Sequence, residues 1–218
     1  MSNPFYRLRK LKNGLNGILL HDIGFLKNKD DTAGTGGKFT FVHKQRSCEL
    51  AALYLTQKNW STYDNYTVQH FISCTGPRSI IDAVPFNNHS ERLIGESICT
   101  ADYLGQMSGP NYLKKLYPLF LEFDESDDYR NIPKDNRMFK SPEELILSTP
   151  DFWENTIIHK LEEECHGLYK FLAQPYPDGI NAYMQNVEDN IDIIRKEFEN
   201  TANREKYFGK ISLNTKGS

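Results

Sequence analysis

The sequence lacks the paired cysteines from which structural zinc clusters are built. It has four cysteines among 218 residues, and no two of them form a C-x-x-C pair. Three lie in apolar helical patterns, where a reduced and buried cysteine is common. The cysteines are Cys48, Cys74, Cys99 and Cys165. Their spacing argues against a zinc cluster and indicates a reducing compartment, so a cytoplasmic location is expected.

Long apolar runs and an excess of one charge are also missing. No stretch approaches the roughly 18 apolar residues of a membrane span, and the N-terminus lacks the apolar core of a signal peptide. The formal net charge is -3, with 25% charged residues. We therefore expect neither a membrane-bound protein nor general nucleic-acid binding. The basic stretch at 7–12 is short, and a solvated helix face accounts for it.

No convincing strand pattern occurs, whereas helical spacing of apolar residues runs through most of the chain, so an all-α fold is predicted. We expect helices over 5–24, from 43 onward, over 61–75, over 91–107 and over 111–123. Gly76-Pro77 and Gly109-Pro110 separate the later ones. The helical core is predicted to span 1–125.

The C-terminal part has its own start signals. A charged linker is expected over 126–140, followed by a helical extension over 141–207 that packs on the core. Ser141 before Pro142 is typical of a helix start. Thr149-Pro150 shows the same helix-start pattern and predicts a second helix that runs to Leu172. A last amphipathic helix over 181–204 is a candidate face for a homodimer.

Residues 25–42 form a polar, glycine-rich segment without helical spacing. Such a long loop is uncommon inside a compact domain. A lid or binding loop and a tolerated surface insertion are both consistent with the composition.

His21 and Asp22 are the first candidates for chemistry. They follow three apolar residues at the end of a helix that must pack. A buried carboxylate is costly without partners, and imidazole nitrogen with carboxylate oxygen suits a first-row transition metal. The alternative is that Asp22 caps the next turn and the backbone satisfies His21.

Asp102 and His43 are the next candidates. Asp102 lies inside a helix beside an apolar stripe, where aspartate has poor propensity, so a specific partner is expected. That partner is a metal or a basic residue across the interface. His43 at a helix start is poorly placed to carry charge, which favours a neutral ligand. Lys44 and Arg46 could hold a phosphate, or lie on a solvated face.

The ordered motifs "ILLHDIGF", "H-x-x-R-S" and "TADYLGQM" resemble the HD superfamily of metal-dependent phosphohydrolases over roughly 15–125. The later part resembles the C-terminal region of a bacterial branch. The resemblance implies an HD-domain-like helical bundle with additional C-terminal helices. It also implies one or two divalent ions (Mn, Fe, Ni or Zn, with Mg as an alternative) and a small phosphorylated substrate, for example a nucleotide.

Individual roles follow from the same resemblance. His21, Asp22 and Asp102 match the metal ligands, and Asp22 would bridge two ions where two are bound. Asp22 and His43 are the expected catalytic residues. The expected substrate-binding residues are Lys44, Arg46 and Gln106.

The sequence departs from the family pattern at one ligand, because no histidine precedes His21. Either the first helix has been lost, or another side chain substitutes for its histidine. Lys44 also stands where an acidic residue is expected. Two functions are therefore carried forward: a metal-dependent phosphohydrolase, and a degenerate HD-like domain that binds a ligand or protein partner without turnover. Whether the chain is an enzyme stays open at this point.

Overall fold

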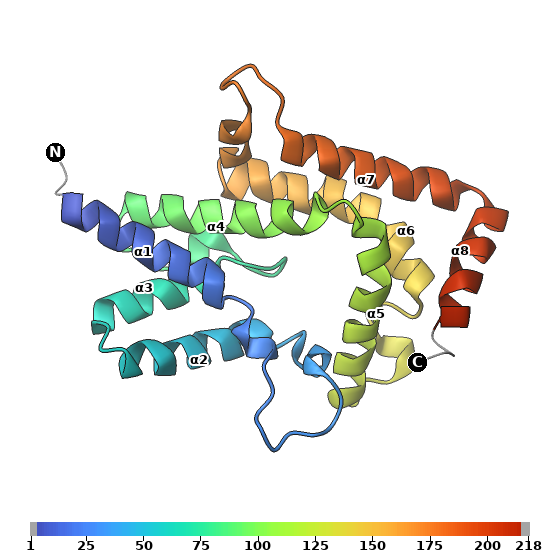
Figure 1. Ribbon diagram of the computed structural model, residues 1–218, viewed down its shortest axis with the longest axis horizontal. Helices are drawn as coiled ribbons and strands as arrows, with labels where there is room; N and C mark the ends of the chain where they lie inside the picture. Colours follow the sequence, from blue (N-terminus) through green and yellow to red (C-terminus); the bar gives the residue numbers. More distant parts are fainter. Residues whose placement is uncertain (1–3, 215–218) are drawn as a thin grey trace.

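The computed structural model describes the backbone of residues 4–214 and the side chains of residues 8–207 (Figure 1). Every regular element in this range is a helix, and the one β-bridge, between Gln174 and Ile180, stands alone. The all-α prediction is confirmed. No helix in the same range combines the length and apolar character needed to cross a membrane.

Five helices form the N-terminal part, close to the predicted positions. They are α1 (Pro4–Leu20), α2 (His43–Gln57), α3 (Thr62–Ser73), α4 (His89–Met107) and α5 (Tyr112–Tyr129). Local caps explain the agreement. The hydroxyl of Ser61 accepts from the Asp64 amide at 3.1 Å, and the side chain of Asn88 accepts from the Glu91 amide at 3.1 Å. Such bonds stabilise a helix start through residues three apart.

Two boundaries in this part differ from prediction. The first helix ends at Leu20, and the expected end near residue 24 becomes a separate 3-10 turn, η1 (Ile23–Phe25). The fifth helix continues through Pro118 to Tyr129, so the segment predicted as a linker over 126–140 begins inside a helix. Ser126 and Asp127 are buried, which explains why the charged sequence stays helical there.

The C-terminal part contains one start that was predicted wrongly. The helix α6 (Pro142–Phe152) begins at the Ser141 cap as expected, but Thr149 and Pro150 lie inside it. The Thr149 hydroxyl donates back to the Leu145 carbonyl at 2.9 Å instead of capping a new helix. The chain then continues through other helical turns. They are the π-helical turns η5 (Trp153–Ile157) and η6 (Lys160–Glu164), and the 3-10 helix η7 (Leu168–Leu172).

The last predicted helix is divided in two. The helix α7 (Ala182–Glu199) ends before Asn200, whose backbone is extended, and α8 (Thr201–Asn214) follows at an angle (Figure 1). The apolar stripe of α7 is buried within the chain. Its members are Val187, Ile191, Ile194 and Phe198.

One apolar core joins the two predicted parts. Leu104 of α4, Leu116 of α5, Trp153 of η5 and Ile191 of α7 are each at most 1% exposed and belong to the same cluster. The C-terminal helices therefore share one apolar core with α4 and α5. A smaller cluster joins α2 and α3 through Ala51, Leu55, Val68 and Ile72.

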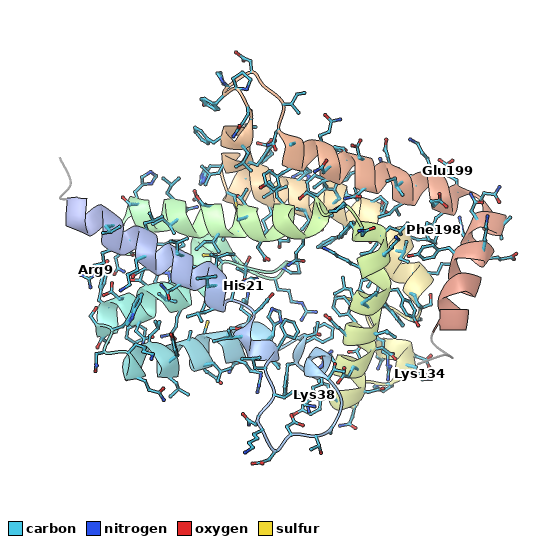
Figure 2. The ribbon with its side chains drawn as sticks, in the orientation of Figure 1. Arg9, His21, Lys38, Lys134, Phe198 and Glu199 are labelled. Atoms are coloured by element: carbon cyan, nitrogen blue, oxygen red, sulfur yellow. The ribbon has the colours of Figure 1, made fainter. Side chains whose placement is uncertain are left out.

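The glycine-rich loop is tied to α5. Lys38 lies in this loop (Figure 2). It is 6% exposed, and its ammonium donates to Asp31 Oδ1 at 2.6 Å. Thr35 bonds to the carboxylate of Glu125 through both its amide and its hydroxyl. The Ser126 hydroxyl donates to the Lys38 carbonyl at 3.0 Å. These bonds hold the loop, with its short 3-10 turn η2 (Gly36–Phe39), against the helix.

Candidate functional site

A close backbone contact places the histidine–aspartate doublet beside the start of α2. The amide of Gly24, two residues after Asp22, donates to the buried Ser47 hydroxyl at 2.8 Å. A Cβ atom at Gly24 would lie 1.9 Å from the His43 carbonyl oxygen. Only glycine permits this approach, so Gly24 brings the doublet and His43 together.

Both histidines present the same ring nitrogen to the site. Nδ1 of His21 lies 2.6 Å from the Ile18 carbonyl oxygen, and Nδ1 of His43 lies 2.7 Å from the Thr40 carbonyl oxygen. A carbonyl oxygen only accepts, so each Nδ1 carries the proton of its bond. The same backbone contact orients metal-binding histidines in proteins, where Nε2 is then the ligand atom.

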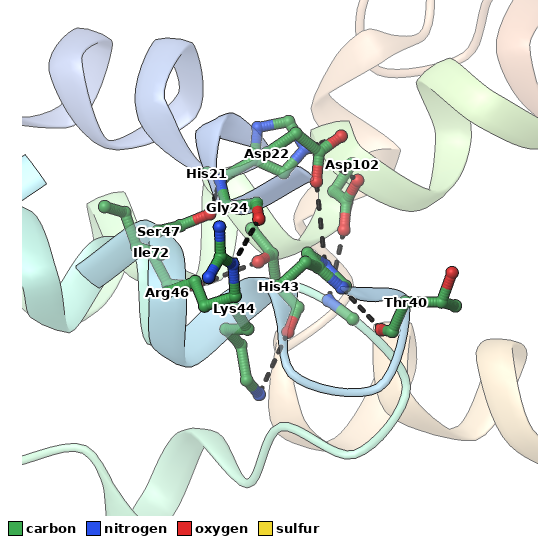
Figure 3. Close-up of polar contacts among 12 residues, drawn as sticks. His21, Asp22, Gly24, Thr40, His43, Lys44, Arg46, Ser47, Ile72 and Asp102 are labelled. Carbon is green, nitrogen blue, oxygen red and sulfur yellow. Dashed lines mark hydrogen bonds and ion pairs between the residues drawn. The ribbon is translucent and has the colours of Figure 1, made fainter. Parts of the chain in front are cut away.

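The two Nε2 atoms face carboxylates (Figure 3). Nε2 of His21 lies 3.2 Å from Asp22 Oδ2 and 3.5 Å from Asp102 Oδ1. Nε2 of His43 lies 3.6 Å from Asp22 Oδ1. Asp22 thus directs one oxygen to each imidazole. The structure brings together all four side chains that were expected to form the site.

Asp102 is held rigidly and Asp22 is not. Asp102 is 8% exposed, its Oδ2 accepts from the Gly76 amide at 3.1 Å, and its Oδ1 accepts from Gln106 at 2.8 Å. Gln106, expected to bind substrate, is therefore engaged in positioning this carboxylate. The Asp22 side chain is 52% exposed, and its ion pairs within the described residues are with the two histidines.

The carboxylates perturb the titration of the doublet. Burial opposes a charge on His21, but hydrogen bonds to Asp102 and Asp22 outweigh it and raise the pKa of His21 to about 10. Burial likewise opposes ionisation of Asp22, while His21 and His43 outweigh it and lower the pKa of Asp22. In the absence of another cation, the site is therefore an imidazolium between two carboxylates.

The two basic residues expected to bind phosphate differ in their contacts. Arg46 donates to the carbonyls of Gly24 at 2.8 Å and Leu26 at 2.9 Å, and its guanidinium lies 3.7 Å from the Phe39 ring centre. It connects η1 to α2. Lys44 is partly buried and makes one long bond, 3.4 Å, to the Thr75 carbonyl, so its ammonium retains donors for a ligand.

No later histidine replaces the missing upstream one within the described side chains. His166 pairs with Glu96 at 3.0 Å and His159 with Glu163 at 3.3 Å. Nδ1 of His70 is buried without a hydrogen bond to any described residue, and the sixth histidine is His89.

The structure instead shows an acid that the sequence did not single out, Glu122 of α5. The Thr40 hydroxyl donates to its backbone carbonyl at 3.4 Å, beside His43. Burial raises the pKa of Glu122, and the charge of Asp22 raises it further. No spacing rule marks one acid among the many of this helix, so only the docking of the loop reveals it.

The donor set fits a divalent ion in type. With metal–ligand distances of about 2.1 Å, neighbouring ligand atoms lie roughly 3.0 Å apart in an octahedron and roughly 3.4 Å apart in a tetrahedron. The 3.2 Å contact at His21 falls in this range, whereas the contacts of 3.5 and 3.6 Å are slightly longer. Within the described residues, however, no three His, Cys, Asp or Glu side chains are arranged to hold an ion. Asp22, the most exposed of the four, would have to rotate.

Comparison with known protein families identifies the family of this chain. The Npun_R2479-like family model matches residues 13–175. The chain belongs to the Npun_R2479-like family. The match contains every candidate residue of the site, and it continues through α6 to η7 before ending ahead of α7. The helices after α5, up to η7, are therefore part of the family unit. No curated protein and no solved structure matches the chain.

Proposed function

We propose that this protein is an HD-type, metal-dependent phosphohydrolase acting on a small phosphoester, with nucleotides as the first class to test. The carrying observation is the pair of imidazoles whose Nδ1 atoms are bonded to carbonyls while their Nε2 atoms face Asp22 and Asp102. When loaded, such a site supplies hydroxide near neutral pH and neutralises the charge of phosphoryl oxygens.

A proton or a metal ion between these groups would account for their spacing. With Nδ1 protonated, a neutral imidazole presents a lone pair at Nε2, and a carboxylate presents only lone pairs. Such groups repel at 3.2 to 3.6 Å unless a proton or a metal ion lies between them. One proton on His21 relieves the first contact. A divalent ion relieves the contacts at both histidines, which is why we favour it.

If ions are bound, the residues of the site would have different roles, which depend on how firmly each side chain is held. His21 and Asp102 are held by partly buried hydrogen bonds and would hold a first ion. Asp22 directs one oxygen to each imidazole and would bridge to a second ion at His43. Lys44, with free donors on α2, would bind the phosphate.

A binding role without turnover is the second candidate. It is favoured by two observations: no three ligands share a centre among the described residues, and the pKa of His21 is raised to about 10. A proton would then occupy the position of the ion permanently. The doublet would be a structural ion pair in a domain that binds a ligand or protein partner.

Metal content and turnover separate the two candidates. The purified chain is analysed for Mn, Fe, Ni and Zn, and then assayed with Mn²⁺ on a panel of nucleotides and other phosphoesters. We expect bound metal and hydrolysis, both lost in Asp22→Asn and Asp102→Asn. Asp82→Asn is the control, because Asp82 is exposed and pairs with Arg92 on the surface. Hydrolysis that survives Asp22→Asn, or wild-type protein that stays metal-free and inactive, contradicts the hydrolase.

Location and assembly remain predictions. We propose the cytoplasm, because the cysteines are free in the described structure. A homodimer through the last helix is a weaker proposal, because the apolar stripe of α7 is already buried inside the chain.

A further inference from the structure

A second site lies beyond the doublet. An open cleft of about 430 Å³ separates the loop 77–80 from residues 155–164, and it contains none of the four doublet-site residues. The π-helical turns η5 and η6 form one wall. Turns of this kind are rare and occur frequently at functional sites. The volume suits a small ligand.

The wall of the cleft contains a hydroxyl with no partner. Ser79 is 5% exposed, and its Oγ is buried without a hydrogen bond to any described residue. Buried polar groups in proteins are nearly always bonded, so an exception calls for an explanation. A ligand that accepts a hydrogen bond from Ser79 supplies one.

A buried ammonium lies beside it. Lys160 is 5% exposed, and its Nζ donates to the Ser79 carbonyl at 2.6 Å and to Glu164 Oε1 at 2.8 Å. An ammonium has three donors, and the third meets no acceptor among the described residues. Glu164 is fully engaged, since its Oε2 accepts from the Ile81 amide at 3.0 Å. Its charge is therefore matched within the wall.

Arg78 supplies a positive charge to the cleft lining that no described carboxylate pairs. Arg78 is exposed and makes no ion pair within the described residues, and its guanidinium lies 5.1 Å from the ring centre of Phe41. Glu163, the other acid of the cleft, is exposed and contacts His159 at 3.3 Å.

We propose that this cleft binds the phosphate group of a small phosphorylated molecule, held by Arg78, the Ser79 hydroxyl and the third N–H of Lys160. Asn155 and Thr156, on the facing turn, would contact the polar remainder of that molecule. These three donors line the same cleft, and two of them belong to buried side chains. The site does not depend on a metal at the doublet.

Inorganic phosphate is the probe. Full-length protein treated with EDTA is titrated while backbone amide signals are followed by NMR. We expect saturable shifts over 76–81 and 155–164, unchanged in Asp22→Asn. Ser79→Ala and Arg78→Ala should each weaken binding about tenfold, the value of one bond to a charged group. Ser148→Ala is the matched control, because that hydroxyl donates to the Leu145 carbonyl inside α6.

Thermal unfolding adds a readout that a structural serine would not give. The Ser79 hydroxyl has no bond to lose, so ligand-free Ser79→Ala should unfold at the wild-type temperature or above it. Ser47→Ala, which removes the partner of the Gly24 amide, should unfold at a lower temperature. The proposal is overturned if phosphate shifts no signal in the cleft, if Ser79→Ala binds as tightly as wild type, or if it unfolds as early as Ser47→Ala. Acetate binding as tight as phosphate binding would replace the assignment with a carboxylate site. Loss of metal or turnover at the doublet leaves these outcomes unaffected.

Discussion

Nε2 of His21 lies 3.5 Å from Oδ1 of Asp102, although the two residues come from the end of α1 and the interior of α4. The contact exists because Gly76 and Gln106 hold the aspartate while the Ile18 carbonyl holds the imidazole. Each partner arrives already oriented, which is the condition for a rigid ligand pair. The predictions below test this arrangement and its supports.

The charge on His21 should make the metal-free protein less stable in base. Because the folded pKa of His21 is raised from 6.5 to about 10, its contribution to stability is fully present below pH 6.5 and is lost as pH rises through about 10. In EDTA, the difference in unfolding temperature between wild type and His21→Gln should be largest near pH 6 and shrink towards pH 10. A difference independent of pH would show that the imidazolium does not form. Saturating Zn²⁺ should abolish the pH trend, since the ion replaces the proton.

Gly24→Ala should unfold the site. Its Cβ would meet the His43 carbonyl oxygen at 1.9 Å, and backbone cannot yield as a flexible side chain does. We expect a loss of about 3 kcal/mol or more in the free energy of unfolding, measured with urea. Gly105→Ala is the control, because nothing lies within 4 Å of its added Cβ in α4. Helix propensity should then add up to about 1 kcal/mol of stability. Equal effects at the two glycines would contradict the close approach.

Arg46 and Lys44 should behave differently despite lying two residues apart. Arg46→Lys loses the two-point contact with the Gly24 and Leu26 carbonyls, and about 2 kcal/mol of stability is expected to go with it. Lys44→Gln removes one long bond and should change the free energy of unfolding by less than about 1 kcal/mol.

Measurement of KM should also distinguish Lys44 from Arg46. If the hydrolase proposal holds, Lys44→Gln should raise KM for the phosphoester about tenfold, while folded Arg46→Lys keeps KM near wild type. The opposite assignment follows if Arg46→Lys raises KM without loss of stability.

Thr35→Val should loosen the glycine-rich loop. The substitution removes the hydroxyl bond to Glu125 and preserves the shape of the side chain. Limited proteolysis is expected to cut between residues 26 and 36 several-fold faster than in wild type, because local opening governs cleavage. Thr56→Val is the control, since the Thr56 hydroxyl bonds to the Ala52 carbonyl and the Asn65 side chain, away from the loop. Unchanged cleavage would show that the remaining bonds of Lys38 suffice to hold the loop.

The helices and the candidate residues could be predicted because their signals are local. Ser61 and Ser141 each cap a helix through a residue three positions ahead, and the apolar spacing of α7 places its buried stripe without reference to any partner. The ordered motifs singled out His21, Asp22, His43 and Asp102 for the same reason, since each lies in a short pattern of its own. Thr149 shows the limit of such signals. Its hydroxyl can either cap a new helix or donate to the carbonyl four residues earlier, and within the buried helix it donates to the Leu145 carbonyl.

Tertiary structure decided what those residues meet. Whether Nε2 of His21 finds a carboxylate, and whether Arg46 binds a ligand or two carbonyls, depends on how η1 docks on α2, and the sequence carries no distance between them. The backbone of Glu122 is bonded to Thr40 only because the loop packs on α5, and the unpartnered Ser79 hydroxyl is exceptional only because it is buried. The sequence by itself determined an all-helical chain and singled out four candidate residues that the structure brings together. Only the packing of distant segments determined their orientation, protonation and partners, because those properties depend on burial and contact rather than on spacing along the chain.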